Sequence, residues 1–288
     1  MMTKIIHTEK QRSNMTICSE MIEKDDHDRY LTTLFADADK RRSLNTLYAF
    51  NIELSKVLDS SKEPLVSEIK LQWWHDSLEA IQNGSIANHP ILEEMSVLLQ
   101  KCEVSIEDLL VLIDSRRYEL RDTHAKTLKD LVNFCRLTAG TLNRLTLQIL
   151  NPNSCHSDHH HAEQMGTAWG LVGIIRAISF HAASQRCLIP KDLLEQANIC
   201  QEDLYKGVFS PELKQVIKLI CDKAEDILRL AIAAVPKANK NAFLLAPITA
   251  HYIKCLKEVS YDIERVDFQK DSVSKLMRLT WTALTGRL

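Results

Sequence analysis

Apolar residues recur at helical spacing along almost the whole chain, and this pattern restricts the fold more than any other feature of the sequence. Between residues 44 and 58 the apolar positions are mostly three or four residues apart, which gives a helix one wide buried face. They are Leu44, Leu47, Tyr48, Phe50, Leu54, Val57 and Leu58. Only seven glycines and seven prolines occur in 288 residues, too few for the many tight turns of a β-sandwich or barrel. The sequence therefore predicts an all-α protein.

The same pattern predicts further helices joined by short loops. They span residues 64–82, 90–101, 105–119, 128–150, 163–182, 190–197, 211–235, 243–259 and 271–284. Helix-start signals support several of them, such as Ser105 with Asp108 three residues later, and Pro90 in a first turn. No linker or repeat of fixed period divides the chain, so we predict one helical domain over residues 26–288. Residues 1–25 are polar and are expected to form a flexible leader that is neither a secretory signal nor a transit peptide.

Charge and cysteine content exclude several classes of protein. The formal net charge is -2 and no basic block occurs, which argues against a nucleic-acid binder. Eight cysteines without a CxxC pair indicate reduced core residues of a cytoplasmic protein rather than disulfides or a zinc site. The apolar run over residues 166–183 has almost membrane-spanning length but contains Arg176 and His181, so we expect a buried helix there.

Four segments carry a resemblance to a known family. They are DADKRRSLNTLYAFNIELSKVLD with the following IKLQWWHDSLEAI, then FCRLTAGTLNRLTLQIL, GTAWGLVGIIRAISFHAASQRCLIP and HYIKCLKEVSYDI. In this order they resemble the motifs of the squalene/phytoene synthase family, and the similarity covers roughly residues 28–288. The resemblance implies a single isoprenoid-synthase helical bundle around a central cavity. It also implies head-to-head joining of two prenyl diphosphates, for which two Asp-rich helical motifs hold Mg²⁺ ions.

The two Asp-rich motifs are degenerate in this chain. The segment Ser55-Lys56-Val57-Leu58-Asp59 stands where the family has Asp-Asp-x-x-Asp, so only Asp59 is retained. Where the family has Arg-Asp-x-x-Glu-Asp, the chain keeps Arg176 and places Ala177, Phe180 and His181 at the acidic positions. A lone carboxylate three residues from a lysine is a poor Mg²⁺ site. We therefore predict no metal and no cofactor, with Mg²⁺ required only if the chain is an active enzyme.

These departures resemble the non-catalytic branch of the family, typified by mitochondrial complex I assembly factor 6. The resemblance implies an assembly or interaction factor for respiratory complex I, the NADH dehydrogenase, with a protein partner. We expect it to be cytoplasmic or to contact the inner membrane peripherally, without a signal peptide or a transmembrane helix. Two alternatives stay open: an active prenyl-diphosphate transferase of isoprenoid biosynthesis, and a binder of a prenyl or phospholipid phosphate.

The positive residues near the motifs allow two interpretations. No acid occurs from Gln164 through Lys191, and a charge on the apolar helix that carries Arg176 requires a partner. Arg176 either pairs with an internal acid such as Glu53 or Glu119, or binds an anion directly. The second interpretation assigns ligand binding to Lys56, Arg176, His181 and Arg186 without metal.

Three other features have simpler expected roles. In the family, basic residues at the position of Arg41-Arg42 meet the diphosphate, and we expect at least one of the two to be solvated here. The histidine-rich segment 155–164 is expected to be a polar loop, although it has residues that bind transition metals. Trp73 and Trp74 are expected in the core.

Overall fold

The computed structural model describes residues 16–59, 63–102, 104–120, 125–233, 235–268 and 272–287. These residues form helices joined by turns and short loops, with no β-strand among them, so the all-α prediction is confirmed. Contacts divide the chain into two compact units, Met1–Arg121 with Leu145–Cys155, and Asp122–Arg144 with His156–Leu288. Because the chain passes between the units three times, no single linker marks their boundary in the sequence. One domain over residues 26–288 stays a prediction.

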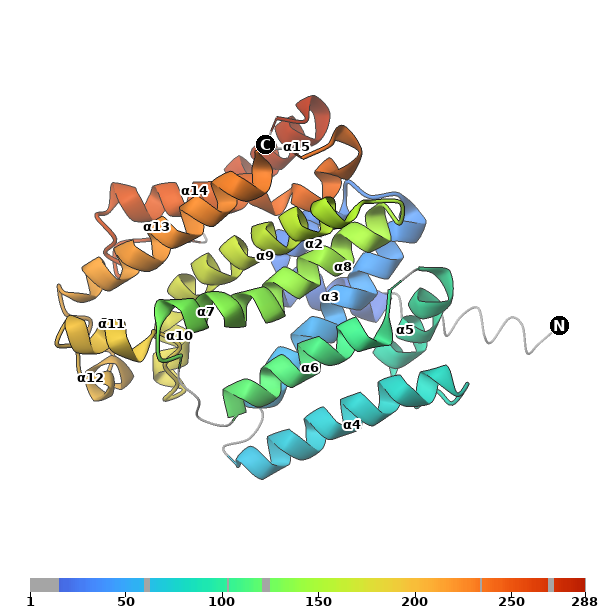
Figure 1. Cartoon of the computed structure of the whole chain (residues 1–288), viewed down its shortest axis with the longest axis horizontal. Helices are drawn as coiled ribbons and strands as arrows, with labels where there is room; N and C mark the ends of the chain where they lie inside the picture. Colours follow the sequence, from blue (N-terminus) through green and yellow to red (C-terminus); the bar gives the residue numbers. More distant parts are fainter. Residues whose placement is uncertain are drawn as a thin grey trace. The chain divides into compact units, whose positions relative to one another are not determined.

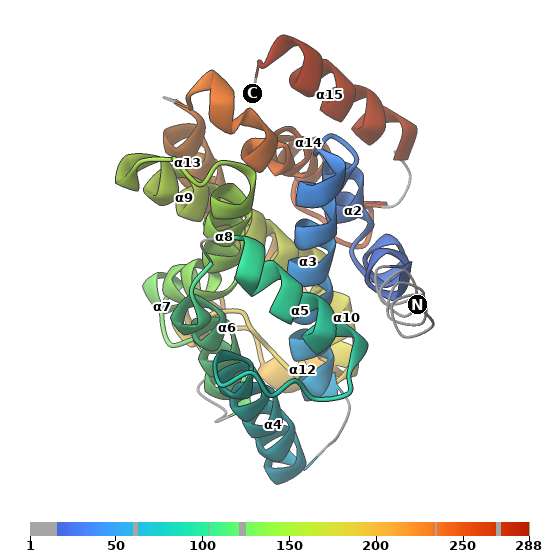
Figure 2. The same ribbon diagram turned by 90° about the vertical axis from the view of Figure 1, so that its right-hand side faces the viewer.

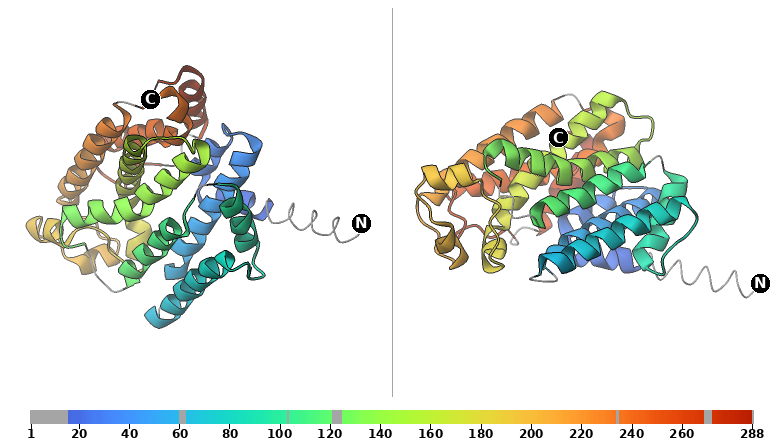
Figure 3. Two further views of the ribbon diagram at one scale, coloured as in Figure 1. Left: turned by 45° about the vertical axis from the view of Figure 1, so that its right-hand side comes forward. Right: turned by 60° about the horizontal axis from the view of Figure 1, so that its bottom comes forward.

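The first unit is built around the long helix α3 (Ala38–Asp59). Four helices pack against it: α2 (His27–Thr33), α4 (Pro64–Gln82), α5 (Pro90–Lys101) and α6 (Ile106–Leu120). The apolar face of α3 buries Leu47, Phe50 and Leu54 completely, as its spacing predicts. Helix α4 also lies alongside α6 (Figures 1 and 3). The start of α6 follows the expected signal, because the Asp108 amide donates a hydrogen bond of 3.1 Å to Ser105 Oγ.

The first unit corrects the prediction for the leader. Residues 1–15 lie outside the described part of the chain, but residues 16–25 form a helix rather than a flexible segment. Its side chains Cys18 and Ile22 are buried. Two apolar residues four positions apart face one side of a helix, and their burial stabilises a segment whose polar composition alone predicts flexibility.

The second unit is built around α9 (His156–Arg176). Its other elements are α7 (Leu128–Cys135), the π-helix η1 (Arg136–Gly140), the first residues of α8 (Thr141–Leu150), α10 (Ile178–Ala183), α11 (Lys191–Gln196), α12 (Gln201–Tyr205), α13 (Leu213–Ile232), the 3₁₀-helix η2 (Lys237–Phe243), α14 (Leu245–Glu258) and α15 (Ser272–Thr285). Helices α7, α13 and α14 pack on α9, and α15 packs on α14 (Figure 2). Ala168, Leu171 and Val172 of α9 are fully buried.

Glycine allows α9 to approach the π-helix closely. A Cβ atom on Gly166 would lie 2.2 Å from the Ala139 carbonyl oxygen and 2.7 Å from Asn143 Cβ. The Asn143 side chain lies in the same contact and donates a hydrogen bond of 2.9 Å to the Ala162 carbonyl. Two backbones this close tolerate only glycine, so the FCRLTAG segment and α9 form a tightly packed pair.

Two predictions about the region of α9 were wrong. The histidine-rich segment is not a loop, because α9 begins at His156 and Asp158 stands in its first turn, where an acid interacts favourably with the helix dipole. The helix expected over residues 163–182 is interrupted at Ala177, whose ψ of 5° departs from helical geometry, and α10 follows. Neither α9 nor any other described helix is long and apolar enough to cross a membrane.

Candidate functional site

The first degenerate motif forms the last turn of α3. Ser55 Oγ donates a hydrogen bond of 2.7 Å to the Ile52 carbonyl, so its hydroxyl is bound within its own helix. Lys56 Nζ lies 2.8 Å from Asp25 Oδ2 and 3.6 Å from Glu53 Oε1. Asp59 is exposed at the end of the helix. The basic side chain of this motif is therefore held by two acids of the same unit.

Lys56 makes this motif unsuitable for Mg²⁺. Partial burial lowers the pKa of Lys56, but the hydrogen bond that Lys56 donates to Asp25 and the charges of Asp25 and Glu53 outweigh this effect, so the pKa is raised. The ammonium group stays protonated and repels a divalent cation, while its two acids already have a positive partner. Mg²⁺ requires several oxygen ligands in near-octahedral arrangement. The residues present do not fit the ion, and no metal-dependent step is derived from them.

The arginines at the start of α3 are also bound within the first unit. Arg42 makes a bidentate ion pair with Glu94, with Nε 2.6 Å from Oε2 and Nη2 2.9 Å from Oε1. This pair raises the pKa of Arg42 through the hydrogen bonds from its guanidinium to the carboxylate. The Arg41 guanidinium donates to the carbonyls of Thr33, Leu34 and Ala36. Both side chains are also partly exposed, so the expectation that at least one of the two is solvated stays a prediction.

The second degenerate motif lies where α9 ends and α10 begins. The Arg176 Cζ atom lies 4.1 Å from the centre of the Tyr252 ring, 5.5 Å from that of Trp169 and 5.8 Å from that of Phe268. Three aromatic faces stabilise a guanidinium by cation–π attraction. In the first unit, the two acids considered as partners for Arg176 have positive neighbours of their own: Glu53 pairs with Lys56, and Glu119 with Arg116 at 3.1 Å.

The acidic positions of the second motif have no carboxylate. Phe180 is exposed, and its ring contacts His181 edge to face at 5.7 Å. His181 and Arg186 line one small, mostly apolar pocket of about 10 Å³, which has room for about one water molecule. The Arg186 amide donates to the His181 carbonyl at 2.8 Å. Two of the four predicted anion ligands, His181 and Arg186, thus line one pocket, and the anion site itself stays a prediction. The central cavity implied by the resemblance also stays a prediction.

A larger pocket, which was not predicted from the sequence, lies beside the first motif. It has a volume of about 430 Å³ and lies between the end of α3, the middle of α4 and His89. Its lining consists of Glu53, Lys56, Val57, Ile69, Lys70, Trp73, Trp74 and His89. Trp73 is 43% exposed, so its expected core position was wrong, whereas Trp74 is buried. The available signal was that Leu65, Ile69 and Trp73 are four residues apart, on the side of α4 opposite to its core residues.

Aromatic rings form one wall of this pocket. The His89 ring lies 5.7 Å from Trp73 and 5.1 Å from Trp74, edge to face in both cases. Burial lowers the pKa of His89 more than the nearby carboxylates of Glu53 and Glu93 raise it. His89 is therefore neutral near pH 7, and the pocket combines an apolar aromatic wall with the ammonium groups of Lys56 and Lys70.

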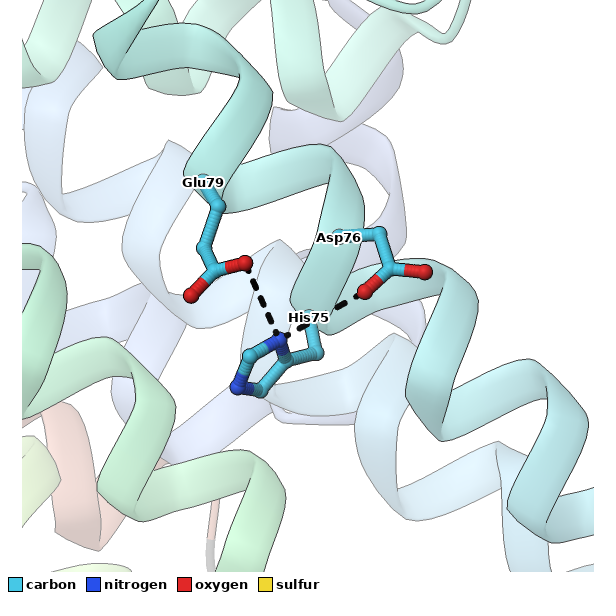
Figure 4. Close-up of side chains that lie close together, drawn as sticks. All are labelled: His75, Asp76 and Glu79. Atoms are coloured by element: carbon cyan, nitrogen blue, oxygen red, sulfur yellow. Dashed lines mark ion pairs between the residues drawn. The ribbon is translucent and has the colours of Figure 1, made fainter.

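One cluster of side chains of the types that can bind a metal ion also lies on α4. His75 Nδ1 is 3.7 Å from both Asp76 Oδ1 and Glu79 Oε2 (Figure 4). Both carboxylates are exposed, and Asp76 also accepts a hydrogen bond of 2.6 Å from Gln72. Ion pairing along a solvated helix face accounts for this arrangement. Among the described residues, the histidines of α9 do not join such a group.

Comparisons with known proteins agree with the all-α fold and with the resemblance found in the sequence. Mouse NADH dehydrogenase (ubiquinone) complex I assembly factor 6 is 29% identical over 259 residues, which covers 89% of this chain and 78% of that protein. Phytoene synthase of Mycobacterium bovis is 26% identical over 207 residues, covering 71% and 67%. A crystal structure of a dehydrosqualene synthase has a TM-score of 0.81 at 16% identity, covering 97% of this chain and 99% of that one. The sequence profile of squalene/phytoene synthases matches residues 22–280. The chain therefore belongs to the squalene/phytoene synthase family.

Proposed function

We propose that this protein is a non-catalytic member of its family that assists the assembly of respiratory complex I. The observation that carries the proposal is the ion pairing of Lys56 with Asp25 and Glu53 at the first motif. An ammonium group tied to the nearby acids replaces the cluster of carboxylates that metal-dependent diphosphate departure requires. Ala177, Phe180 and His181 likewise supply no carboxylate at the second motif.

Sequence similarity supports the proposed role in assembly over a role in prenyl transfer. The mouse assembly factor matches a larger share of this chain than the mycobacterial phytoene synthase does, 89% against 71%. A protein that keeps the fold and loses the acids retains a large helical surface on which a partner protein can bind. We propose that the partner is a component or precursor of complex I, and that the chain works in the cytoplasm or at the inner face of the membrane that holds the complex.

Deletion of the gene, followed by complementation, tests the role in assembly. The deletion strain should contain less assembled NADH dehydrogenase on native gels, and the wild-type chain should restore it. The variant Asp59→Asn removes the last acid of the motifs and should restore the complex equally well. An unchanged level of the complex after deletion would contradict the proposal, and failure of Asp59→Asn alone would indicate that the remaining acid has a chemical role.

The pocket beside Lys56 favours a second candidate function, the binding of a prenyl or phospholipid phosphate. A volume of about 430 Å³ lies within the usual range for small-molecule sites. Trp73, Trp74 and Ile69 suit an apolar chain, and Lys70 suits a phosphate group. Thermal-shift titration with farnesyl diphosphate, with and without Mg²⁺, tests this candidate. A shift that is independent of Mg²⁺ and lost in Trp73→Ala would support it, and no shift in either condition would reject it.

A further inference from the structure

Helix α15 presents two faces of different character. Lys275, Leu279 and Thr282 are buried on the side that packs in the second unit. On the other side, Met277 is 62% exposed, Trp281 61% and Leu284 81%. The spacing of four and three residues places these three side chains on one stripe of the helix, over about 10 Å of its length. Three large apolar side chains side by side on a surface indicate a binding face rather than scattered exposure.

The charged side chains that α15 and η2 bring to this stripe are positive. The chain has no Asp or Glu after Asp271 and none between Asp226 and Glu258. Arg278 and Arg287 are exposed beside the stripe and at its end. Lys240 of η2 lies against Gly286, since a Cβ atom at that glycine would meet the lysine side chain. In a chain of net charge -2, residues 227–257 and 272–287 therefore bring basic side chains to this region and contain no acid.

One lysine of α15 has a different role. The Lys275 ammonium lies 4.8 Å from the centre of the Tyr252 ring and donates a hydrogen bond of 3.2 Å to the Phe268 carbonyl. These contacts attach the inner face of α15 to α14 and to the segment before α15. The helix is therefore fixed on its inner side, and its apolar stripe needs no rearrangement to reach a partner.

We propose that the outer face of α15, formed by Met277, Trp281 and Leu284 with Arg278 and Arg287, docks on the surface of an anionic phospholipid bilayer. Tryptophan favours the interface between lipid headgroups and acyl chains, where aliphatic side chains enter beside it. Arginine binds lipid phosphates, and stable attachment generally requires both an apolar and an electrostatic contribution. A second copy of this chain is the alternative occupant, and it has a different outcome in the test below. The proposal does not depend on the role in complex I assembly, because it is tested with the purified chain.

Vesicle flotation of the full-length protein tests the proposal. The wild-type chain should bind vesicles that contain phosphatidylglycerol, bind pure phosphatidylcholine vesicles much more weakly, and lose binding as salt concentration rises. The double variant Met277→Ser/Trp281→Ser should partition at least about tenfold more weakly. Arg278→Glu/Arg287→Glu should lose the preference for anionic vesicles. The matched control Leu65→Ser/Val208→Ser changes two exposed apolar residues elsewhere and should bind normally.

Three results would overturn the proposal. The first is no binding of the wild-type chain to anionic vesicles, and the second is unchanged binding by both α15 variants. The third is that light scattering shows self-association of the wild-type chain and monomers of the α15 variants, while lipid binding does not differ between them. That result would assign the face to a second copy of the chain. Circular dichroism of each variant checks that its helix content is retained.

Discussion

The ion pair between Arg42 and Glu94 gives the sharpest test of how the first unit uses its basic residues. The Glu94 side chain is only 1% exposed, whereas that of Arg42 is 22% exposed. Truncation by Arg42→Ala removes both hydrogen bonds and leaves a buried carboxylate without its positive partner. Breaking a buried pair in this way costs about 3–5 kcal/mol. Because Arg42 is partly exposed, water can reach the space it leaves, so we expect about 3 kcal/mol, the lower end of that range.

The comparison variant is Lys56→Ala, which breaks an ion pair of the same unit at a more exposed place. The Lys56 side chain is 47% exposed, and such pairs contribute about 0.2–1 kcal/mol. Urea unfolding followed by circular dichroism measures both costs. The double variant Arg42→Met/Glu94→Leu should recover most of the loss, since it leaves no buried charge. A cost for Arg42→Ala within about 0.5 kcal/mol of that for Lys56→Ala would refute the reasoning.

Three further predictions follow from packing and from the pKa shifts. Gly166→Ala should lower the free energy of unfolding by about 1–3 kcal/mol in urea titration, because its Cβ would overlap the Ala139 carbonyl, and a neutral effect would contradict this contact. Cys200, which is exposed, should react with a maleimide in the native protein, whereas Cys18, which is buried and has a pKa raised to about 12, should react only after unfolding. Because the pKa of His89 is lowered, the folded state binds a proton on this ring less readily than the unfolded state does. The contribution of the neutral ring to stability is therefore present above the unfolded pKa of His89 and declines as pH falls below that pKa. His89→Phe should therefore lose less thermal stability than the wild type between pH 7 and pH 5, and identical losses would count against this assignment.

The helices were predictable because their apolar spacing is regular and the chain has few breaks. The leader was not, because only Cys18 and Ile22 of residues 16–25 are buried, and two positions make no visible periodicity. The histidine-rich segment was predicted as a loop for a related reason. It forms the first turns of a long helix, and polar residues without apolar spacing resemble a loop in the sequence. The interruption at Ala177 has no proline or glycine to mark it.

The loss of the acidic motifs was readable from sequence, because six positions align with two spaced patterns. The acids that pair with Lys56 and Arg42 could not be predicted from the sequence. Asp25 lies 31 residues before Lys56, and Glu94 lies 52 residues after Arg42, so only the packing of α3 with its neighbours brings these groups together. The pocket beside Trp73 was missed because an aromatic pair on a helix usually faces the core, whereas here the two rings meet edge to face and only Trp74 is buried.

We propose above all that this chain retains the fold of its family without the family's metal-dependent chemistry. Incubation of the purified protein with farnesyl and geranylgeranyl diphosphates and Mg²⁺, followed by extraction and mass spectrometry of hydrocarbons, tests it most directly. The degenerate motifs predict no hydrocarbon above the level of a protein-free control, with both diphosphates recovered intact. A squalene- or phytoene-like product formed in proportion to the amount of protein would contradict the claim.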